Sequence, residues 1–382
     1  MKQVIKKIIK ETNNITDEKP IYTLLVDGNS VMKMSLVDKR LNRRGEEYGM
    51  VFQTLLQVKM QLQRKKFDYT YILYDGDQSG KLRYDIYKDY KANRDKNYDE
   101  SEYDKAINDY CKKVLNYSKN KNGKKKNEDD DENFQRQRGI LFKCFEELFC
   151  RQLIFDYVEG DDLIAYYCKH KKPNEKIVIV SGDRDLTQLI SDDICVYVTQ
   201  LKKYITPQNH IQYIGYTHEN VMLKKIICGD VSDNIKGIKG LGEKTFFELF
   251  PDAKTKKLSL NDIIDISHKL IEERTSKKLK PLKSTENIIN RVTNGCQGEE
   301  IFEINKKIID LSNPLLTDEA IIGMNEIMHA PLDPEGRDFK NLYQIIQDND
   351  MIDLLDTNIF SSFFSSFNGL IDNEKNFFKK TG

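Results

Sequence analysis

The sequence predicts an α/β protein in which a mainly parallel central sheet is flanked by helices. Two observations carry this prediction. Short apolar runs, typical of strands covered on both faces, alternate with helical segments from Ile21 onward. Acidic residues follow almost every one of these runs. Alternating strands and helices favour parallel pairing, and ligands of such sheets bind beyond the carboxyl ends of the strands. We therefore expect a functional site at that edge.

Six apolar runs are the predicted strands. They cover residues 21–26, 69–74, 153–158, 176–180, 194–198 and, as a hairpin partner of the fifth, 203–206. Helices are expected after Ser30, over 48–65, 140–150 and 218–228, and starting near residues 160 and 186. Beyond Pro251 the chain is helical and polar in pattern, with expected helices over 260–273, 286–292, 299–311 and 339–355.

The amino-acid composition limits the classes of protein to which this chain can belong. Of the 382 residues, 32% are charged and 39% hydrophobic, which is typical of a globular protein with a very charged surface. The formal net charge is zero, so a polyanionic partner requires the signs to be segregated on the surface. Seven cysteines without a CxxC pair indicate reduced thiols and a cytoplasmic location, in the host cytoplasm if the protein is viral. No stretch approaches the roughly 20 apolar residues of a membrane span.

The carboxylates that follow strands or begin helices are the main chemical signal. They lie in five separate segments, and they are Asp27, Asp75, Glu159, Asp161, Asp162, Asp183, Asp185, Asp230 and Asp233. Helix capping explains one or two of them. Clustered carboxylates repel one another unless cations neutralise them. Two divalent ions about 3.5–4 Å apart would do so, and they could catalyse displacement at a phosphodiester.

The stretch 228–245 combines acids with a glycine-spaced turn. Asp230 and Asp233 are three residues apart, which on a helical turn places both on one face. The glycines Gly237, Gly240 and Gly242 would let the backbone approach a phosphate at a helix N-terminus. Taken alone, the stretch is equally well explained as a capping Asp, a loop Asp and a connector.

Two further segments are rich in charge. Residues 79–96 interleave basic side chains with tyrosines, which suits phosphates and bases but also fits a solvated amphipathic helix. Residues 93–138 form a connection well above the usual length of about 12–15 residues, so that it is either functional or mobile. It contains a lysine block followed by the acidic block Glu128–Glu132.

These motifs together resemble the 5′-nuclease, or flap endonuclease, superfamily, and within it the phage-type 5′ nucleases that include a T-even phage RNase H. The matching stretches recur in the family's order over roughly residues 20–250, and they are 24–30, 74–94, 157–165, 178–189 and 229–245. The resemblance implies a PIN-like sheet domain, a helix–three-turn–helix DNA-binding module and a helical C-terminal region. It also implies two Mg²⁺ ions, for which Mn²⁺ can substitute, and a K⁺ ion in the helix–three-turn–helix.

The resemblance also implies roles for single residues. Asp27, Asp75, Glu159 and Asp161 would surround the first metal ion, with Asp162 close by. Asp183, Asp185 and Asp233 would surround the second, with Asp230 near it through waters. Basic positions that steer the scissile phosphate are matched by Arg83, Lys91 and Arg94. The duplex would be bound by the turn residues Gly237, Lys239, Gly240, Gly242 and Lys244. Residues 93–138 would form an arch over the active site.

Some positions depart from the family pattern. Lys236 stands where many members have proline, and Phe246 stands where a small residue usually follows the glycine turn. Phe246 therefore predicts locally different helix packing. The acidic block Glu128–Glu132 is unusual in an arch that faces DNA.

The expected organisation is an N-terminal extension (1–20), a nuclease core (21–215), the helix–three-turn–helix with helical C-terminal region (216–358) and a Phe/Ser-rich tail (359–382). The expected function is that of a Mg²⁺-dependent structure-specific 5′ nuclease, with exonuclease, RNase H and flap endonuclease activity on DNA or RNA–DNA duplexes. A non-catalytic DNA-binding relative and a PIN-type ribonuclease are the alternatives. We expect a monomer with no membrane partner. The tail either docks on the core or binds a sliding clamp; a single-strand binding protein is a further candidate partner.

Overall fold

The computed structural model describes residues 19–92, 128–292 and 301–381, and for residues 128–131 and 377–381 it describes the backbone only. Most of the expected N-terminal extension and residues 93–127 of the expected arch lie outside these ranges, as does Arg94. None of the described helices is long and apolar enough to cross a membrane.

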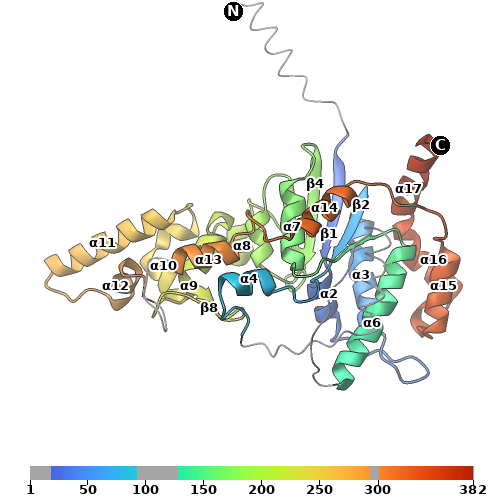
Figure 1. Cartoon of the computed structure of the whole chain (residues 1–382), viewed down its shortest axis with the longest axis horizontal. Coiled ribbons are helices and arrows are strands. Elements are labelled where there is room, and N and C mark those ends of the chain that lie inside the picture. Colours follow the sequence, from blue (N-terminus) through green and yellow to red (C-terminus); the bar gives the residue numbers. More distant parts are fainter. Residues whose placement is uncertain (1–18, 93–127, 293–300, 382) are drawn as a thin grey trace, which may run out of the picture.

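Six strands form the central sheet in the order β3-β2-β1-β4-β5-β6 (Figure 1). Their bounds are β1 Ile21–Asp27, β2 Tyr69–Leu73, β3 Arg151–Leu153, β4 Glu175–Ser181, β5 Ile194–Val198 and β6 Lys203–Ile205. β1 to β5 pair in parallel, and β6 returns antiparallel to β5, as the hairpin prediction requires. The chain leaves β1 toward β2 and β3 and then comes back to β4. The carboxyl ends of β1 and β4 therefore flank the point at which the strand order reverses, where parallel sheets usually bind ligands.

Helices cover both faces of this sheet, as predicted. One face packs against α2 Gly28–Ser35, α3 Gly49–Arg64 and α6 Glu128–Glu147, and the other against α7 Gly160–Lys169, the 3₁₀ turn η1 Asp185–Leu189 and α14 Asp318–Ile327. The alternation of strand side chains explains this arrangement, because Leu24 and Val26 of β1 enter the first core and Leu25 enters the second.

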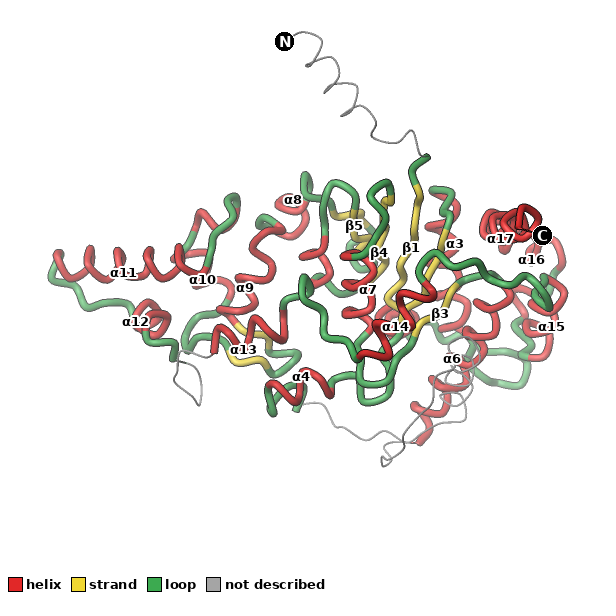
Figure 2. Tube along the Cα trace, turned by 45° about the horizontal axis from the view of Figure 1, so that its top comes forward, coloured by secondary structure: helices red, strands yellow, loops and turns green. Residues whose placement is uncertain are grey.

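A third core lies to one side of the sheet and is built from helices (Figure 2). Its elements are α4 Lys81–Ile86, α9 Val221–Cys228, the short strands β7 Gly229–Asp230 and β8 Ile235–Lys236, α10 Glu243–Leu249, α11 Leu260–Ser276, α12 Lys283–Ile289 and α13 Ile301–Ile309. Some short elements lie within this third core or connect the core to the sheet. They are α8 His210–Ile214, η2 His218–Asn220 and η3 Pro251–Lys254. Phe246 is fully buried here, between the rings of Phe247 and Phe250. The large side chain that departs from the family pattern thus fills this core.

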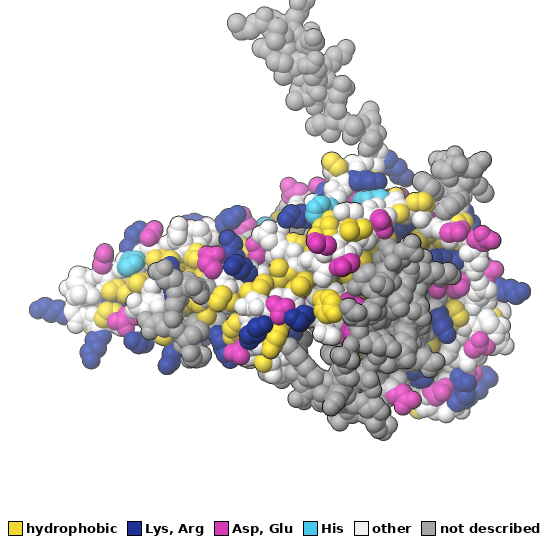
Figure 3. Space-filling view, viewed as in Figure 1, with side chains coloured by type: hydrophobic (Ala, Val, Ile, Leu, Met, Phe, Trp, Pro, Cys, Tyr) yellow, Lys and Arg dark blue, Asp and Glu magenta, His cyan; other side chains and the backbone are white. Residues whose placement is uncertain are grey.

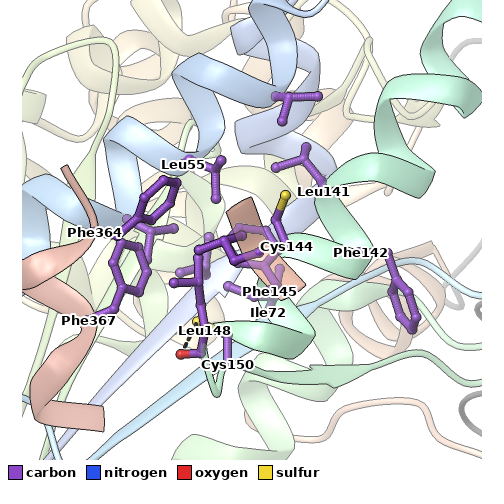
Figure 4. Close-up of a cluster of buried hydrophobic side chains, with 14 of the residues drawn as sticks. Leu55, Ile72, Leu141, Phe142, Cys144, Phe145, Leu148, Cys150, Phe364 and Phe367 are labelled. Atoms are coloured by element: carbon purple, nitrogen blue, oxygen red, sulfur yellow. Dashed lines mark hydrogen bonds between the residues drawn. The ribbon is translucent and has the colours of Figure 1, made fainter. Parts of the chain in front are cut away.

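The C-terminal tail docks on the sheet domain. It comprises most of α16 Thr357–Phe364, with η5 Ser365–Phe367 and α17 Asn368–Thr381, and it follows α15 Phe339–Asp348 and η4 Ile352–Leu354. Phe364 and Phe367 are buried in the same cluster as Leu55 of α3 and Leu148 (Figure 4). A buried ion pair of 2.6 Å joins Glu374 of α17 to Arg151 of β3. Phe360 and Phe363, which a clamp-binding peptide would expose, are buried as well.

Several predicted boundaries were wrong. The third strand was expected over 153–158, but β3 ends at Leu153 because the next residues turn out of the sheet, where Tyr157 has a φ of 69°. The helix expected from residue 140 begins at Glu128, so the acidic block starts this helix and is not a mobile loop. The helix expected over 339–355 ends at Asp348, close to Asp350 with a φ of 47°. Only a 3₁₀ turn follows Asp183, and α14 was not predicted.

Candidate active site

Two acids are fixed directly beyond neighbouring strands. Asp27 ends β1 and caps α2, accepting hydrogen bonds from the Ser30 amide at 3.0 Å and the Ser181 hydroxyl at 2.6 Å. Asp75 follows β2 and accepts from the Asn29 side chain at 2.6 Å and the Gly160 amide at 2.8 Å. These bonds leave neither carboxylate free to rotate into solvent.

The backbone after β2 packs closely against the backbone after β3, and this packing allows Asp75 to lie beside the other acids. A side chain on Gly76 would place its Cβ 1.7 Å from the carbonyl oxygen of Phe155. Only glycine fits there, and the Gly76 amide donates to the Val158 carbonyl at 3.0 Å. The contact brings the loop before α7, with its acids, next to Asp75.

Asp161 and Asp183 complete a group of mutually repelling acids. Burial, together with the charges of Asp75 and Asp183, raises the pKa of Asp27 to about 7. Burial followed by the charge of Asp185 raises the pKa of Asp183 to about 6. For Asp161, burial and then Asp27 and Asp183 hold the pKa well above its usual range. These shifts share two physical causes, which are burial first and then the repulsion of carboxylates brought together without enough positive charge.

This group has the chemistry of a site for hard divalent cations. Carboxylate oxygens are the ligands that Mg²⁺ prefers, and a cation would relieve the repulsion that raises the pKa values. Among the residues that the structure describes, no three acidic, histidine or cysteine side chains already form a complete metal-binding group. The donor atoms therefore fit such ions by type and charge, and Asp27, Asp75, Asp161 and Asp183 are among the acids that could hold them.

Glu159 lies beside this group but is neutralised by protein cations. Its carboxylate contacts Lys91 Nζ at 2.5 Å and Arg83 Nη1 at 2.8 Å, and it accepts a hydrogen bond from the Tyr90 hydroxyl at 3.0 Å. Burial alone would raise the pKa of Glu159, but Arg83 and Lys91 outweigh it and lower that pKa. The pKa of Glu159 is thus shifted in the direction opposite to the pKa values of Asp27, Asp161 and Asp183.

Arg83 and Asp162 hold each other inside the protein. Asp162 is almost fully buried, pairs with two guanidinium nitrogens of Arg83 and accepts the Leu315 amide at 3.0 Å. Arg83 also donates to the Ile308 carbonyl at 2.8 Å. In this structure Asp162 pairs with Arg83, and Arg83 in turn lies 2.8 Å from Glu159. The roles that the resemblance implies, with Asp162 close to a metal ion and Arg83 on the scissile phosphate, stay predictions.

Asp185 and Asp230 share a cation that was not predicted. Lys225 of α9 contacts the carboxylate of Asp185 and lies 2.7 Å from that of Asp230. Its side chain is 11% exposed. Burial alone would raise the pKa of Asp230, but Lys225 reverses this and lowers it to about 2. The expected second metal site therefore has an ammonium group among its acids.

Asp230 and Asp233 lie on a hairpin and not on a helical turn. β7 and β8 pair antiparallel around residues 231–234. The carboxylate of Asp230 accepts from the Ser232 amide at 2.7 Å. The Asp233 carbonyl accepts a hydrogen bond from the Lys91 amide at 2.8 Å. This bond connects the hairpin to the basic segment 79–96. Burial alone would lower the pKa of Lys91, but the charge of Glu159 and then that of Asp233 raise it.

The sequence pattern of the family described as "5′-3′ exonuclease, N-terminal resolvase-like domain" matches residues 22–215. This span covers half of the chain and includes the acids that follow β1, β2 and β4. The chain belongs to the 5′-3′ exonuclease family. The match ends before the hairpin, so Lys225, Asp230 and the glycine turn lie outside it.

Relatives agree with this family. A 5′-3′ exonuclease of Mycoplasmopsis pulmonis (strain UAB CTIP) is 29% identical over 265 residues, which are 67% of this chain and 74% of that protein. DNA polymerase I of Bacillus subtilis (strain 168) is 34% identical over 121 residues, 30% of this chain and 14% of the polymerase. The chain thus matches only a small part of the polymerase relatives.

One solved structure shows that the fold is shared. T5 5′-exonuclease with bound zinc ions superposes with a TM-score of 0.52 at 16% identity, covering 92% of this chain and 99% of that one. A bacteriophage T5 flap endonuclease, solved with DNA and metal ions, has the same TM-score and identity. At this identity the likeness concerns the fold.

The glycine turn of this 5′-3′ exonuclease family member is an exposed corner that hydrogen bonds attach to the segment after α11. Gly240 has a φ of 78°, and Gly242 precedes α10, which is only seven residues long. The Lys239 amide donates to the Val292 carbonyl at 2.9 Å, and the Asn287 side chain donates to the Lys239 carbonyl at 2.8 Å. Lys244 is 91% exposed.

Sequence reasoning missed four polar residues of the site. These are Asn29, Tyr90, Ser181 and Lys225, which orient or neutralise the acids. The first three lie within the matching motifs and could have been found by asking which side chain satisfies each buried carboxylate. Lys225 precedes Asp230 by about one helical turn, and only the fold reveals that it also reaches Asp185.

Proposed function

We propose that this chain hydrolyses phosphodiester bonds near the 5′ ends of nucleic acids, as a Mg²⁺-dependent 5′-3′ exonuclease and flap endonuclease. The observation that carries the proposal is the group Asp27, Asp75, Asp161 and Asp183, which is placed beyond the strand ends and whose mutual repulsion divalent cations would relieve. Membership of the 5′-3′ exonuclease family supports it, as do the relatives that carry this name.

The proposed ligands divide into two sets. Asp27, Asp75, Glu159 and Asp161 would hold one ion, and Asp183, Asp185 and Asp233 a second, with Asp230 near it through waters. When bound, such ions supply an activated water and neutralise charge on the phosphate. Mg²⁺ is proposed from the all-oxygen donor set, for which Mn²⁺ can substitute.

The chain's own residues would position the substrate. Lys91 is the basic side chain best placed to reach a phosphate, since its ammonium lies among Glu159, Asp233 and Asp75 and its side chain is 20% exposed. Tyr90 and Arg83 would keep Glu159 ionised and fixed. Arg83 acts through Glu159 in this proposal and does not touch the phosphate.

The duplex would rest on the corner formed by Gly237, Lys239, Gly240, Gly242 and Lys244. Exposed backbone and two exposed lysines beside the hairpin support this placement. A K⁺ ion at this corner belongs to the same proposal. Flap, nicked and RNA-primed duplexes are the proposed substrates, so RNase H activity is included. We propose a monomer in the cytoplasm; clamp or single-strand binding partners remain predictions, and the buried Phe360 and Phe363 favour docking of the tail on the core.

A direct test compares the cleavage of two substrates with and without Mg²⁺. The purified protein is incubated with a 5′-labelled DNA flap and with a single-stranded RNA of the same sequence, in Mg²⁺ or in EDTA. The proposal predicts flap cleavage that needs Mg²⁺ and prefers the branched duplex. Cleavage in EDTA would rule out the metal mechanism, preference for the RNA would favour a PIN-type ribonuclease, and binding without cleavage would favour a non-catalytic relative.

A further inference from the structure

The helices α11 and α12 form an arm that projects from the third core at the end of the molecule farthest from the C-terminal tail (Figure 1). α11 has 17 residues and is therefore about 25 Å long. It is attached near its start, where Ile263 is buried in the third core, and α12 is attached by Ile288. The turn between the two helices forms the outer end of the arm.

The outer end of the arm is basic. Residues 274–285 include Arg274, Lys277, Lys278, Lys280 and Lys283 and no acidic residue. We call residues 274–283 the arm tip. Figure 3 shows lysine and arginine side chains standing out at this end of the molecule. A chain with a net charge of zero thus places a run of positive charge at the tip of this projection.

Few contacts hold these cations to the protein. Lys277 pairs with Glu273 at 2.5 Å and Lys283 with Glu286 at 3.6 Å, but the two lysine side chains are 60% and 82% exposed. Exposed pairs of this kind contribute little to stability and exchange readily for another anion. Lys278 and Lys280 are exposed as well.

The arm tip is continuous with the proposed duplex surface. The end of α12 is bonded to the glycine turn through Asn287 and Val292, which hold both the carbonyl and the amide of Lys239. α12 runs from the arm tip to this point over seven residues, or about 10 Å. Exposed lysines therefore occur at both ends of one rigid helix.

We propose that the arm tip binds the phosphate backbone of the duplex beyond the part held by the glycine turn. This inference rests on the proposed function and extends its substrate contact outward. A duplex that follows α12 outward for at least about 10 Å would be contacted over about three or more additional base pairs, at roughly 3.4 Å per pair. Phosphate contacts of this kind are independent of sequence and are weakened by salt.

The test uses a triple variant, Lys277→Gln, Lys278→Gln and Lys280→Gln, in the full chain. A matched control makes the same charge change at the opposite end of the molecule, with Lys143→Gln, Lys340→Gln and Lys375→Gln, all exposed on α6, α15 and α17. Dissociation constants are measured in EDTA with flap DNAs whose duplex has about 8 or about 20 base pairs, over a range of salt. Cleavage of the shorter flap in Mg²⁺ is measured in parallel.

The proposal predicts at least about tenfold weaker binding of the longer duplex by the arm variant, and a salt slope reduced by about 2–3. Binding and cleavage of the shorter flap should stay within about twofold of wild type, and the control should match wild type throughout. Equal losses on both duplexes, or no loss on either, would overturn the inference. Absence of cleavage by the wild-type protein would instead refute the proposed function.

Discussion

Lys225 lies where two acid-bearing segments of the site meet. Its ammonium contacts Asp185 from the segment after β4 and Asp230 from the hairpin, and its side chain is largely buried. Burial alone would lower the pKa of Lys225, but the two carboxylates raise it above its usual value. The ammonium therefore serves as a tethered cation that holds the two segments together when no metal ion is bound.

Replacing Lys225 with Met should change stability and metal binding in opposite directions. Without metal, the unpaired Asp185 and Asp230 should lower the free energy of unfolding by about 2–4 kcal/mol. Mn²⁺, measured by electron paramagnetic resonance, should bind at least about threefold more tightly, because a competing cation is gone. Lys224→Met, which removes the neighbouring pair with Glu243, is the control and should leave Mn²⁺ affinity unchanged. Weaker Mn²⁺ binding by Lys225→Met would show that the ammonium does not compete with the metal.

Asp27 should make the metal-free protein less stable as the pH rises. The pKa of this buried carboxyl is raised from 3.8 to about 7 in the fold. A raised folded-state pKa gives stability that is complete below the unfolded value and is lost as the pH passes through the folded value. Urea unfolding in EDTA should thus show wild type losing about 2–4 kcal/mol relative to Asp27→Asn between about pH 4 and pH 8. Parallel pH profiles for the two proteins would contradict this assignment.

At the scale of elements, the β7–β8 hairpin depends on close packing of its backbone. Gly229 has a φ of 73°, and a Cβ there would lie 2.3 Å from the amide nitrogen of Gly237 and 2.5 Å from the carbonyl oxygen of Ile235. Both contacts are with backbone, which cannot move aside as a flexible side chain can. The hairpin carries Asp230 and Asp233, so its shape determines where these acids lie.

Gly229→Ala should therefore lower the free energy of unfolding by more than about 2 kcal/mol and reduce cleavage as well. Gly45→Ala is a matched control, since Gly45 has a φ of 81° but no atom within 4 Å of an added Cβ. It should cost only about 1 kcal/mol, the penalty of the backbone conformation. Urea unfolding and a flap assay measure both effects. Equal costs at the two positions would mean that the hairpin tolerates the extra atom.

The tail is a second element whose role follows from packing. Phe367 is fully buried, and Phe364 is nearly so, in the core that α3 and α6 form on the sheet. Phe367→Ala should lower the free energy of unfolding by about 3–5 kcal/mol through loss of buried area and creation of a cavity. Ile359→Ala, at a position 51% exposed, should change it by less than about 1 kcal/mol. A small effect of Phe367→Ala would mean that the tail is only loosely attached.

At the scale of the whole molecule, the sequence predicted the architecture better than the side-chain partners. The succession of strands and helices along the chain followed from the apolar runs, and the acids beyond the strand ends followed from the residues directly after these runs, such as Asp27 and Asp183. Lys225 and the pair of Arg83 with Asp162 were not predictable, because they join residues 40–79 positions apart. The docking of α17 on β3 depends in the same way on a contact between residues 223 positions apart.

Acidic and basic side chains lie on different parts of the whole molecule. Acids with raised pKa values lie at the sheet edge, and exposed lysines lie on the glycine turn and the arm tip. A nucleic acid held by the basic surfaces would present a phosphate to the acids, where divalent ions could bridge the two negative partners. Binding and chemistry should therefore be separable by mutation.

The most direct measurement is single-turnover cleavage of a 5′-labelled flap at saturating enzyme, with the dissociation constant of the same DNA measured in EDTA. For Asp183→Asn, we predict a cleavage rate lower by at least about a hundredfold, or about 2.7 kcal/mol of transition-state stabilisation. The dissociation constant should stay within about threefold of wild type, since the substitution does not touch the basic surfaces. Cleavage by Asp183→Asn at the wild-type rate in Mg²⁺ would contradict the claim that these carboxylates form the catalytic metal site.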